Sequence, residues 1–119
     1  MAESTQEKAI VAAYKTQRRI GGVSITYSRL GSEVNLLALP GSSINQVDGH
    51  AQVISEARAR DFDILAEELI LDGEQITPQR GDIVTEDGVE FTLLATGGAP
   101  HWRFIDPYRR IMRVHTKER

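Results

Sequence analysis

Two patterns of apolar and polar positions divide the chain. The N-terminal run has helical spacing, with Ser4 and Glu7 placed as a capping box. Its narrow apolar stripe consists of Ile10, Val11, Tyr14 and Ile20. The glycine pair at 21–22 ends this helix. A helix with so little apolar surface either lies across a barrel end or contacts another subunit, and the pattern leaves both interpretations open.

After the helix, the apolar positions recur at every second residue, which is typical of strands that are buried on one face. The alternating run 23–28, a turn at 30–32 and a returning run at 33–39 predict a β-hairpin. Pro40 and Gly41 are expected to end the second strand, because proline has no backbone N–H to donate to a neighbouring strand.

The stretch from Pro40 to His50, PGSSINQVDGH, is polar and contains few apolar residues. A connection of this length is unusual inside a small domain, so we expect either a flexible connector or a loop that a partner orders. Gln52 to Ile64 predicts a long strand that extends past the core or carries a bulge, because one of its faces begins charged and ends apolar. Residues 65–71 are compatible with one helical turn or with the end of that strand.

Turn sequences divide the remaining chain into short strands. Two Asp-Gly pairs and two further Gly- and Pro-containing segments mark these turns, at 72–73, 87–88, 78–82 and 97–100. Final strands are expected at 102–105 and 109–116, on either side of an Asp-Pro-Tyr turn. The pattern favours a mainly β fold, a small antiparallel β-barrel or sandwich of about six strands with one N-terminal α-helix and a long polar loop.

The composition is that of an ordinary globular domain, with 40% hydrophobic and 26% charged residues in a chain of 119. We therefore expect a single domain over 1–119, with the helix in 1–21 and the barrel in 22–119, including a mobile loop near 40–50.

The absence of cysteine excludes disulfides and thiolate metal sites. No apolar stretch approaches the roughly 20 residues of a membrane span, and the N-terminus lacks the apolar core of a cleaved leader.

Charge is segregated along the sequence. Between 61 and 90, ten acidic residues face Arg80 alone, whereas between 91 and 119 six basic residues face only Asp106 and Glu118. Opposite charges could meet on neighbouring strands of one fold, which is the simpler interpretation. Alternatively, the acidic side of one subunit could meet the basic side of the next in a head-to-tail ring.

A search for catalytic groups is negative. His50, His101 and His115 lie far apart and lack the spacing of a zinc site. Asp61 and Asp63 lie on the same face of a strand and could hold a divalent cation, but a strand with one face turned to solvent explains them more simply. We therefore expect no enzyme activity, no cofactor and no metal.

Two short motifs invite binding functions. The Arg-Gly-Asp within 79–82 is interpreted as a turn that enters a strand rather than as an adhesion motif. Alternate residues of the last strand lie on one face of the sheet. On that face, the basic side chains of Arg109, Arg113, His115 and Lys117 could contact successive phosphates of a nucleic acid. The acidic total charge and the 6% aromatic content weigh against this, yet a small β-barrel nucleic-acid-binding module remains the alternative function.

The second half also carries a family resemblance. The strand LILDGEQITPQRGDIV, the hairpin EDGVEFTLL and the ending WRFIDPYRRIMRVHTKE resemble the C-terminal half of small proteins encoded in tailed-bacteriophage structural modules. Those proteins are head-tail joining, adaptor or head-closure proteins of the virion neck. The similarity covers roughly Phe62 to Glu118, and its most specific points are Trp102-Arg103, the Asp106 to Arg109 segment and His115 to Lys117.

The resemblance implies a structural virion protein without enzymatic activity. It implies a small barrel with a long loop that assembles in the bacterial host cytoplasm as a homo-oligomeric ring in the neck. The expected partners are the portal or adaptor protein, tail-end proteins and, transiently, the packaged DNA. Asp106 and Pro107 are assigned to a fixed turn, and Trp102 to packing more than to contact. Arg109, Arg110 and Arg113 are assigned to intersubunit ion pairs or to DNA-facing positions. Candidate interface residues are Ser42, Ser43, Ile44, Asn45, Arg103, Asp106, Tyr108, Arg109, Arg110 and Arg113.

Overall fold

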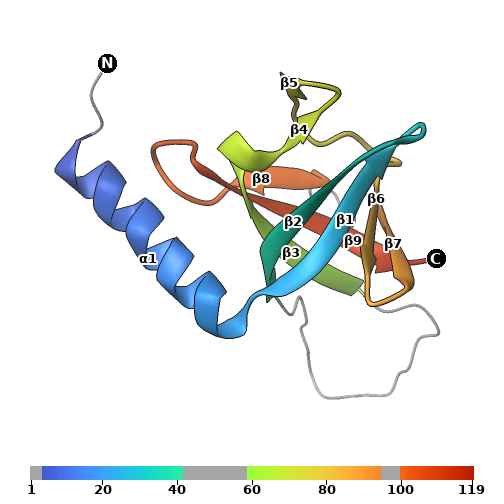
Figure 1. The fold of residues 1–119 in the computed structure, drawn as a ribbon, viewed down its shortest axis with the longest axis horizontal. Helices are drawn as coiled ribbons and strands as arrows, with labels where there is room; N and C mark the ends of the chain where they lie inside the picture. Colours follow the sequence, from blue (N-terminus) through green and yellow to red (C-terminus); the bar gives the residue numbers. More distant parts are fainter. Residues whose placement is uncertain (1–3, 42–58, 95–99) are drawn as a thin grey trace.

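One helix precedes a closed antiparallel β-barrel (Figure 1). The structure, a computed structural model, describes residues 4–41, 59–94 and 100–119. Its elements are α1 (Thr5–Gly21), β1 (Val23–Arg29), β2 (Ser32–Gly41), β3 (Ala59–Leu65), the 3-10 helix η1 (Ala66–Glu68), β4 (Ile70–Leu71), β5 (Glu74–Gln75), β6 (Ile83–Glu86), β7 (Val89–Leu93), β8 (Trp102–Phe104) and β9 (Ile111–Glu118).

The barrel is closed by β9. Strands β3, β2, β1, β6, β7 and β9 are neighbours in this order, and β9 pairs back onto β3 from Ala59↔Lys117 to Leu65↔Ile111. The other edge of β9 is shared, because β7 pairs with its end and β8 with its middle. The predicted mainly β fold is confirmed, and it is a barrel rather than a sandwich.

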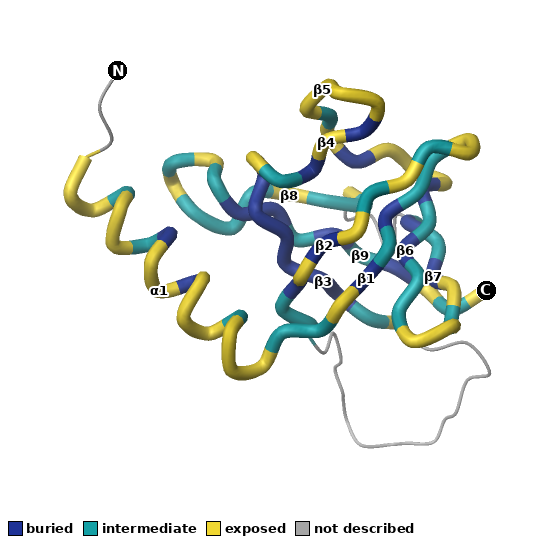
Figure 2. Tube along the Cα trace, viewed as in Figure 1, coloured by how far each residue is buried: buried dark blue, intermediate teal, exposed yellow. Residues whose placement is uncertain are grey.

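Alternation places the apolar residues inside. β3 is buried along most of its length (Figure 2), with Phe62 and Ile64 facing the barrel interior. Phe62 meets Phe91 of β7 edge to face, with ring centroids 5.7 Å apart. Tyr27 of β1 and Val114 of β9 complete this interior and are fully buried. The core therefore draws on strands from both halves of the chain.

The two-residue hairpin signals are confirmed. Asp72-Gly73 joins β4 to β5, and Asp87-Gly88 joins β6 to β7. All four residues have positive φ values, between 53° and 83°. This turn type requires a positive φ at both central residues, and Asp and Gly tolerate it.

The expected end of the second strand is wrong. β2 continues through Pro40 and Gly41, which pair with Phe62 and Asp61 of β3. The pairing of β1 with β2 begins only at Val23↔Ala38, so β2 has a single neighbour beyond Ala38. Proline is tolerated there because its missing N–H leaves no second ladder incomplete.

Other boundaries differ from the expectation by small amounts. The strand expected from Gln52 is present from Ala59, and its earlier part lies outside the described residues, as does the loop after Gly41. Both alternatives for 65–71 hold in part, because β3 ends at Leu65 and one turn of 3-10 helix follows. The last strand begins at Ile111 rather than at Arg109.

Helix α1 packs on the outer face of its own barrel. Val11 and Tyr14 form a second apolar cluster with Leu65 of β3 and Ile111 of β9. The Tyr14 hydroxyl donates a hydrogen bond of 2.5 Å to the backbone carbonyl of Asp63. The Ser4 cap expected from the capping-box spacing is present, because the Ser4 hydroxyl accepts a hydrogen bond from the Glu7 N–H, while the Glu7 carboxylate pairs with Arg110. Ile10 packs against the same cluster, so most of the narrow stripe is used within the chain, whereas Ile20 is 84% exposed.

The carboxylate of Asp82 joins two sides of the barrel. It accepts hydrogen bonds from the Tyr27 hydroxyl at 2.5 Å and from Nε and Nη2 of Arg29, both at 2.8 Å. The backbone N–H of Gln79 adds a fourth bond and completes the predicted turn. Because Asp82 is only 3% exposed, the Arg-Gly-Asp segment presents no accessible carboxylate for adhesion.

We predict that Asp82→Ala lowers the free energy of unfolding by about 3 kcal/mol, because it leaves a buried tyrosine hydroxyl and guanidinium without their acceptor. Urea unfolding followed by Trp102 fluorescence measures the change. Glu74→Ala, at an exposed residue of β5, is the control and should change the free energy by less than about 0.5 kcal/mol. Equal effects of the two substitutions would contradict the assignment.

The buried tyrosines predict a loss of stability at alkaline pH. Burial raises the pKa of Tyr14 from 10.0 to about 12, and burial together with the bond to Asp82 also raises the pKa of Tyr27. The unfolded chain releases a tyrosine proton near pH 10, while the folded chain retains it. The free energy of unfolding therefore falls as pH rises from about 10 to about 12.

Tyr14→Phe should make this alkaline decrease shallower and should cost about 1 kcal/mol at neutral pH through the lost hydrogen bond. Thermal unfolding at a series of pH values from 8 to 11.5 provides the measurement. A variant whose melting temperature falls with pH as steeply as that of the wild type would show that the Tyr14 hydroxyl is not buried in solution.

Candidate assembly surface

The C-terminal segment presents its side chains from β8, β9 and the turn between them. This turn is held by Asp106, whose carboxylate accepts backbone hydrogen bonds from Tyr108 at 2.9 Å, Arg110 at 2.8 Å and Ile111 at 2.7 Å. The fixed turn expected at Asp106 and Pro107 is therefore present. It forces Arg109 to a φ of 59°, which is why β9 starts two residues later than expected.

Two of the candidate arginines are bound within the chain. Arg110 forms ion pairs with Glu7 of α1 and Glu67 of η1 and so ties the turn to the helix. The Arg113 guanidinium contacts both carboxylate oxygens of Asp63, at 2.8 and 3.1 Å. The hydrogen bonds to Asp63 raise the pKa of the Arg113 guanidinium above the usual arginine value.

The acidic and basic segments meet on neighbouring elements, as the simpler interpretation of the charge pattern expects. β9 lies between β3 and β7, and both of these strands come from the acidic segment. The resulting pairs are Asp61–His115 at 2.9 Å, Asp63–Arg113, Glu67–Arg110 and Glu90–Arg119 at 3.1 Å. Within the described residues, no group of three or more His, Cys, Asp or Glu side chains is placed to hold a metal ion.

The remaining candidates differ in accessibility. The side chains of Arg103 and Arg109 are exposed and make no ion pair with any residue that the structure describes. Tyr108 is half-buried. Trp102 packs against the core and contacts Phe104, with ring centroids 5.1 Å apart, as its assignment to packing expected. The loop candidates at 42–45 lie outside the described residues.

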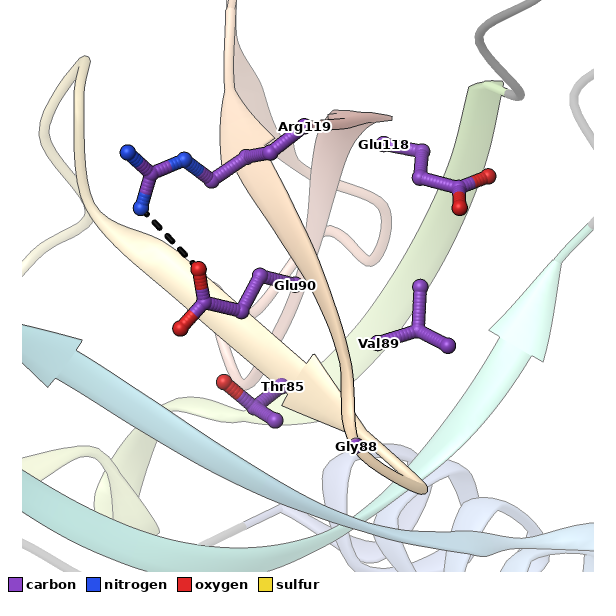
Figure 3. A pocket seen from close by; sticks show the side chains of 6 residues that line it. All are labelled: Thr85, Gly88, Val89, Glu90, Glu118 and Arg119. Atoms are coloured by element: carbon purple, nitrogen blue, oxygen red, sulfur yellow. Dashed lines mark hydrogen bonds and ion pairs between the residues drawn. The ribbon is translucent and has the colours of Figure 1, made fainter.

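A shallow hollow of about 400 Å³ lies beside the end of β9. Figure 3 shows the Arg119 guanidinium beside the Glu90 carboxylate, while the Glu118 side chain points away from this pair. The Arg119 and Glu90 side chains are about half exposed, at 53% and 52%. The hollow presents charged side chains to solvent.

The sequence pattern indicates these arginines but not their partners. Glu7 and Asp63 are separated from their arginines by 103 and 50 residues. Only the closure of the barrel brings them together, and no local spacing could reveal the pairs.

Comparison with known families covers nearly the whole chain. Residues 4–119 match the family model described as phage head-tail joining protein. The chain belongs to this family. Membership extends the resemblance seen in the second half to α1 and the first hairpin. No curated protein and no solved structure was found to match the chain.

The phage head-tail joining family is a family of structural proteins, not of enzymes, and membership implies interaction with other phage head and tail proteins. It points to a place in the virion neck. Among the described residues, no helix is long and apolar enough to cross a membrane.

Arg103 of β8 and Arg113 of β9 are paired residues on neighbouring strands. We predict that substitution of Arg113, but not of Arg103, lowers the free energy of unfolding. Arg113→Ala should lower the free energy of unfolding by about 2 kcal/mol, because Asp63 is then left buried without its cation. Arg103→Ala should change it by less than about 0.5 kcal/mol. Urea unfolding of both variants is the measurement, and a loss of 2 kcal/mol from Arg103→Ala would contradict the free state of that side chain.

Proposed function

We propose that this head-tail joining protein is a neck subunit that assembles into a homo-oligomeric ring between the portal and the tail. The observation that carries the proposal is the family match over residues 4–119. The proposed partners are a portal or adaptor protein on the head side and tail-end proteins on the other side, with assembly in the host cytoplasm before the virion is complete.

The surface of the barrel supports this role. Four large apolar side chains are exposed among the described residues: Ile20 at 84%, Leu30 at 100%, Leu37 at 40% and Ile70 at 42%. They occur on α1, on the first hairpin and beside η1, so an assembled ring has apolar side chains available on more than one side of the subunit.

Charge pairing within the subunit supports a channel that DNA passes without binding. Arg110, Arg113 and Arg119 are each paired with a carboxylate of the same chain. The whole chain carries a net charge of -3, which disfavours retention of a polyanion. On this proposal the contact with the packaged DNA is transient.

A nucleic-acid-binding barrel remains the second candidate, because Arg103, Arg109 and Lys117 are exposed cations near the C-terminus that have no ion-pair partner in the described parts of the chain. Three exposed cations support only weak, salt-sensitive binding to phosphates.

Sedimentation velocity distinguishes the two candidates. We expect the protein to form ring-sized species as its concentration rises, at both low and high salt, and to sediment unchanged when a short DNA duplex is added. A monomer that binds the duplex at low salt, releases it at high salt and binds less in Arg109→Ala would instead favour the nucleic-acid module. Arg113→Ala is not suitable for this comparison, because it also removes an internal ion pair.

A further inference from the structure

An acidic surface lies at the end of the barrel that carries the turn between β1 and β2. The Ser32 hydroxyl donates a hydrogen bond of 2.5 Å to the Asp72 carboxylate, which joins this turn to the hairpin of β4 and β5. Glu33 follows Ser32, and Glu74 follows the Asp72-Gly73 turn. All three acidic side chains are exposed and form no ion pair with any residue that the structure describes. We call Glu33, Asp72 and Glu74 the acidic patch.

The arginine beside this turn does not neutralise the acidic patch. Arg29 donates hydrogen bonds of 2.8 Å to both carboxylate oxygens of Asp82. Asp82 is buried, so this ion pair is complete within the subunit. The three carboxylates of the acidic patch therefore remain available to cations of a partner.

Leu30 adds an apolar side chain at the tip of the same turn. Its φ is 50°, a region that is unfavourable for leucine, and its side chain is 100% exposed. The bonds of Arg29 and Ser32 hold the turn on both sides of Leu30. Little conformational entropy is therefore lost when Leu30 enters a contact.

The solvent-facing side of α1 carries the opposite charge. Lys8, Lys15 and Arg19 follow one another at spacings of seven and four residues, which places them on one face of the helix. All three are exposed, and within the described ranges none of them forms an ion pair. We call Lys8, Lys15 and Arg19 the basic face.

The acidic side chains closest to the basic face are already bound to other arginines. Glu7 pairs with Arg110 at 2.8 Å, and Glu68 pairs with Arg18 at 2.6 Å. Ile20 follows Arg19 in the last turn of α1 and is 84% exposed. The basic face therefore resembles the acidic patch, because each surface combines three unpaired charges with one exposed apolar side chain.

The two surfaces lie on different sides of the subunit. Figure 1 shows α1 along one side of the barrel, whereas β1 runs away from the helix to its turn with β2 at the far side. The seven residues of β1 span about 20 Å between the end of α1 and Leu30. The acidic patch therefore cannot contact the basic face of its own chain.

We propose that the acidic patch and Leu30 of one subunit bind the basic face of α1 on a second copy of this chain. Three unpaired carboxylates then meet three unpaired cations. Leu30 and Ile20 add apolar area that salt does not screen, so the contact persists at high salt. Two different surfaces that bind each other form a head-to-tail contact, which generates a ring when the rotation closes. This contact deepens the proposed ring function and rests on it.

Charge reversal on each surface tests the contact. Lys15→Glu on the basic face and Glu33→Lys in the acidic patch should each weaken self-association by about tenfold or more, because like charges then face each other. An equimolar mixture of the two variants should associate as the wild type does, since each variant offers the surface that the other lacks. Sedimentation velocity over a concentration series is the measurement.

A matched control separates the surface from the net charge. Gln6→Glu combined with Gln17→Glu adds the same net charge to α1 as Lys15→Glu does, but at two exposed positions on a different face of the helix. This double variant should associate as the wild type does. Equal weakening in the control and in Lys15→Glu would overturn the contact, and so would a mixture of Lys15→Glu and Glu33→Lys that stays monomeric.

Leu30→Asn separates assembly from folding. Asparagine tolerates a positive φ, so the melting temperature should equal or exceed that of the wild type. Self-association should weaken by about tenfold, because an apolar side chain is lost from the contact. A lower melting temperature would overturn the role of Leu30, because Leu30 would then stabilise its own subunit.

The outcomes distinguish the contact from the ring itself. Lys15→Glu and Glu33→Lys proteins that form rings at wild-type concentrations would overturn this contact and leave the proposed ring intact. Wild-type protein that remains monomeric at every concentration would overturn both proposals. Both reversal variants should melt within about 3 °C of the wild type, because the substituted side chains are exposed.

Discussion

The ladder between β3 and β9 closes the barrel, and most other features depend on it. It runs over all seven residues of β3 and joins segments about 50 positions apart in the chain. On its inner face it completes the apolar core with Phe62 and Val114, and on its outer face it brings Leu65 and Ile111 together as the platform for α1. Without this ladder the sheet would have two open edges, and Leu65 and Ile111 would no longer form a shared platform for the helix.

The ladder also explains why part of the basic C-terminal segment is paired with acidic residues of the same chain. β9 carries the basic residues, and its neighbours β3 and β7 both come from the acidic stretch. Arg113 and His115 are therefore placed opposite Asp63 and Asp61 by register alone. Opposite charges that are distant in the sequence stabilise the closing strand, and this leaves the outer surface better suited to protein contact than to holding DNA.

The two-residue hairpin turns differ in how well their residues suit the backbone. The Asp72-Gly73 and Asp87-Gly88 turns use residues that tolerate a positive φ, whereas Leu30 adopts a φ of 50° at a cost and is fully exposed. Backbone strain of this kind is found more often at functional positions than elsewhere.

The sequence by itself determined the local structure: the helix with its cap, the hairpin turns with positive φ and the strands with alternating burial. These depend on residues within a few positions of one another, and each therefore leaves a readable pattern. Asp106 was recognisable as a turn residue for the same reason.

The extension of β2 through Pro40 could not be recognised from the sequence, because a proline is tolerated there only when the second neighbouring strand is missing. The tertiary structure alone decided which carboxylate each arginine binds and that α1 packs on its own barrel. Each of these depends on which distant strands become neighbours, and strand order is set by closure of the whole sheet rather than by any local spacing.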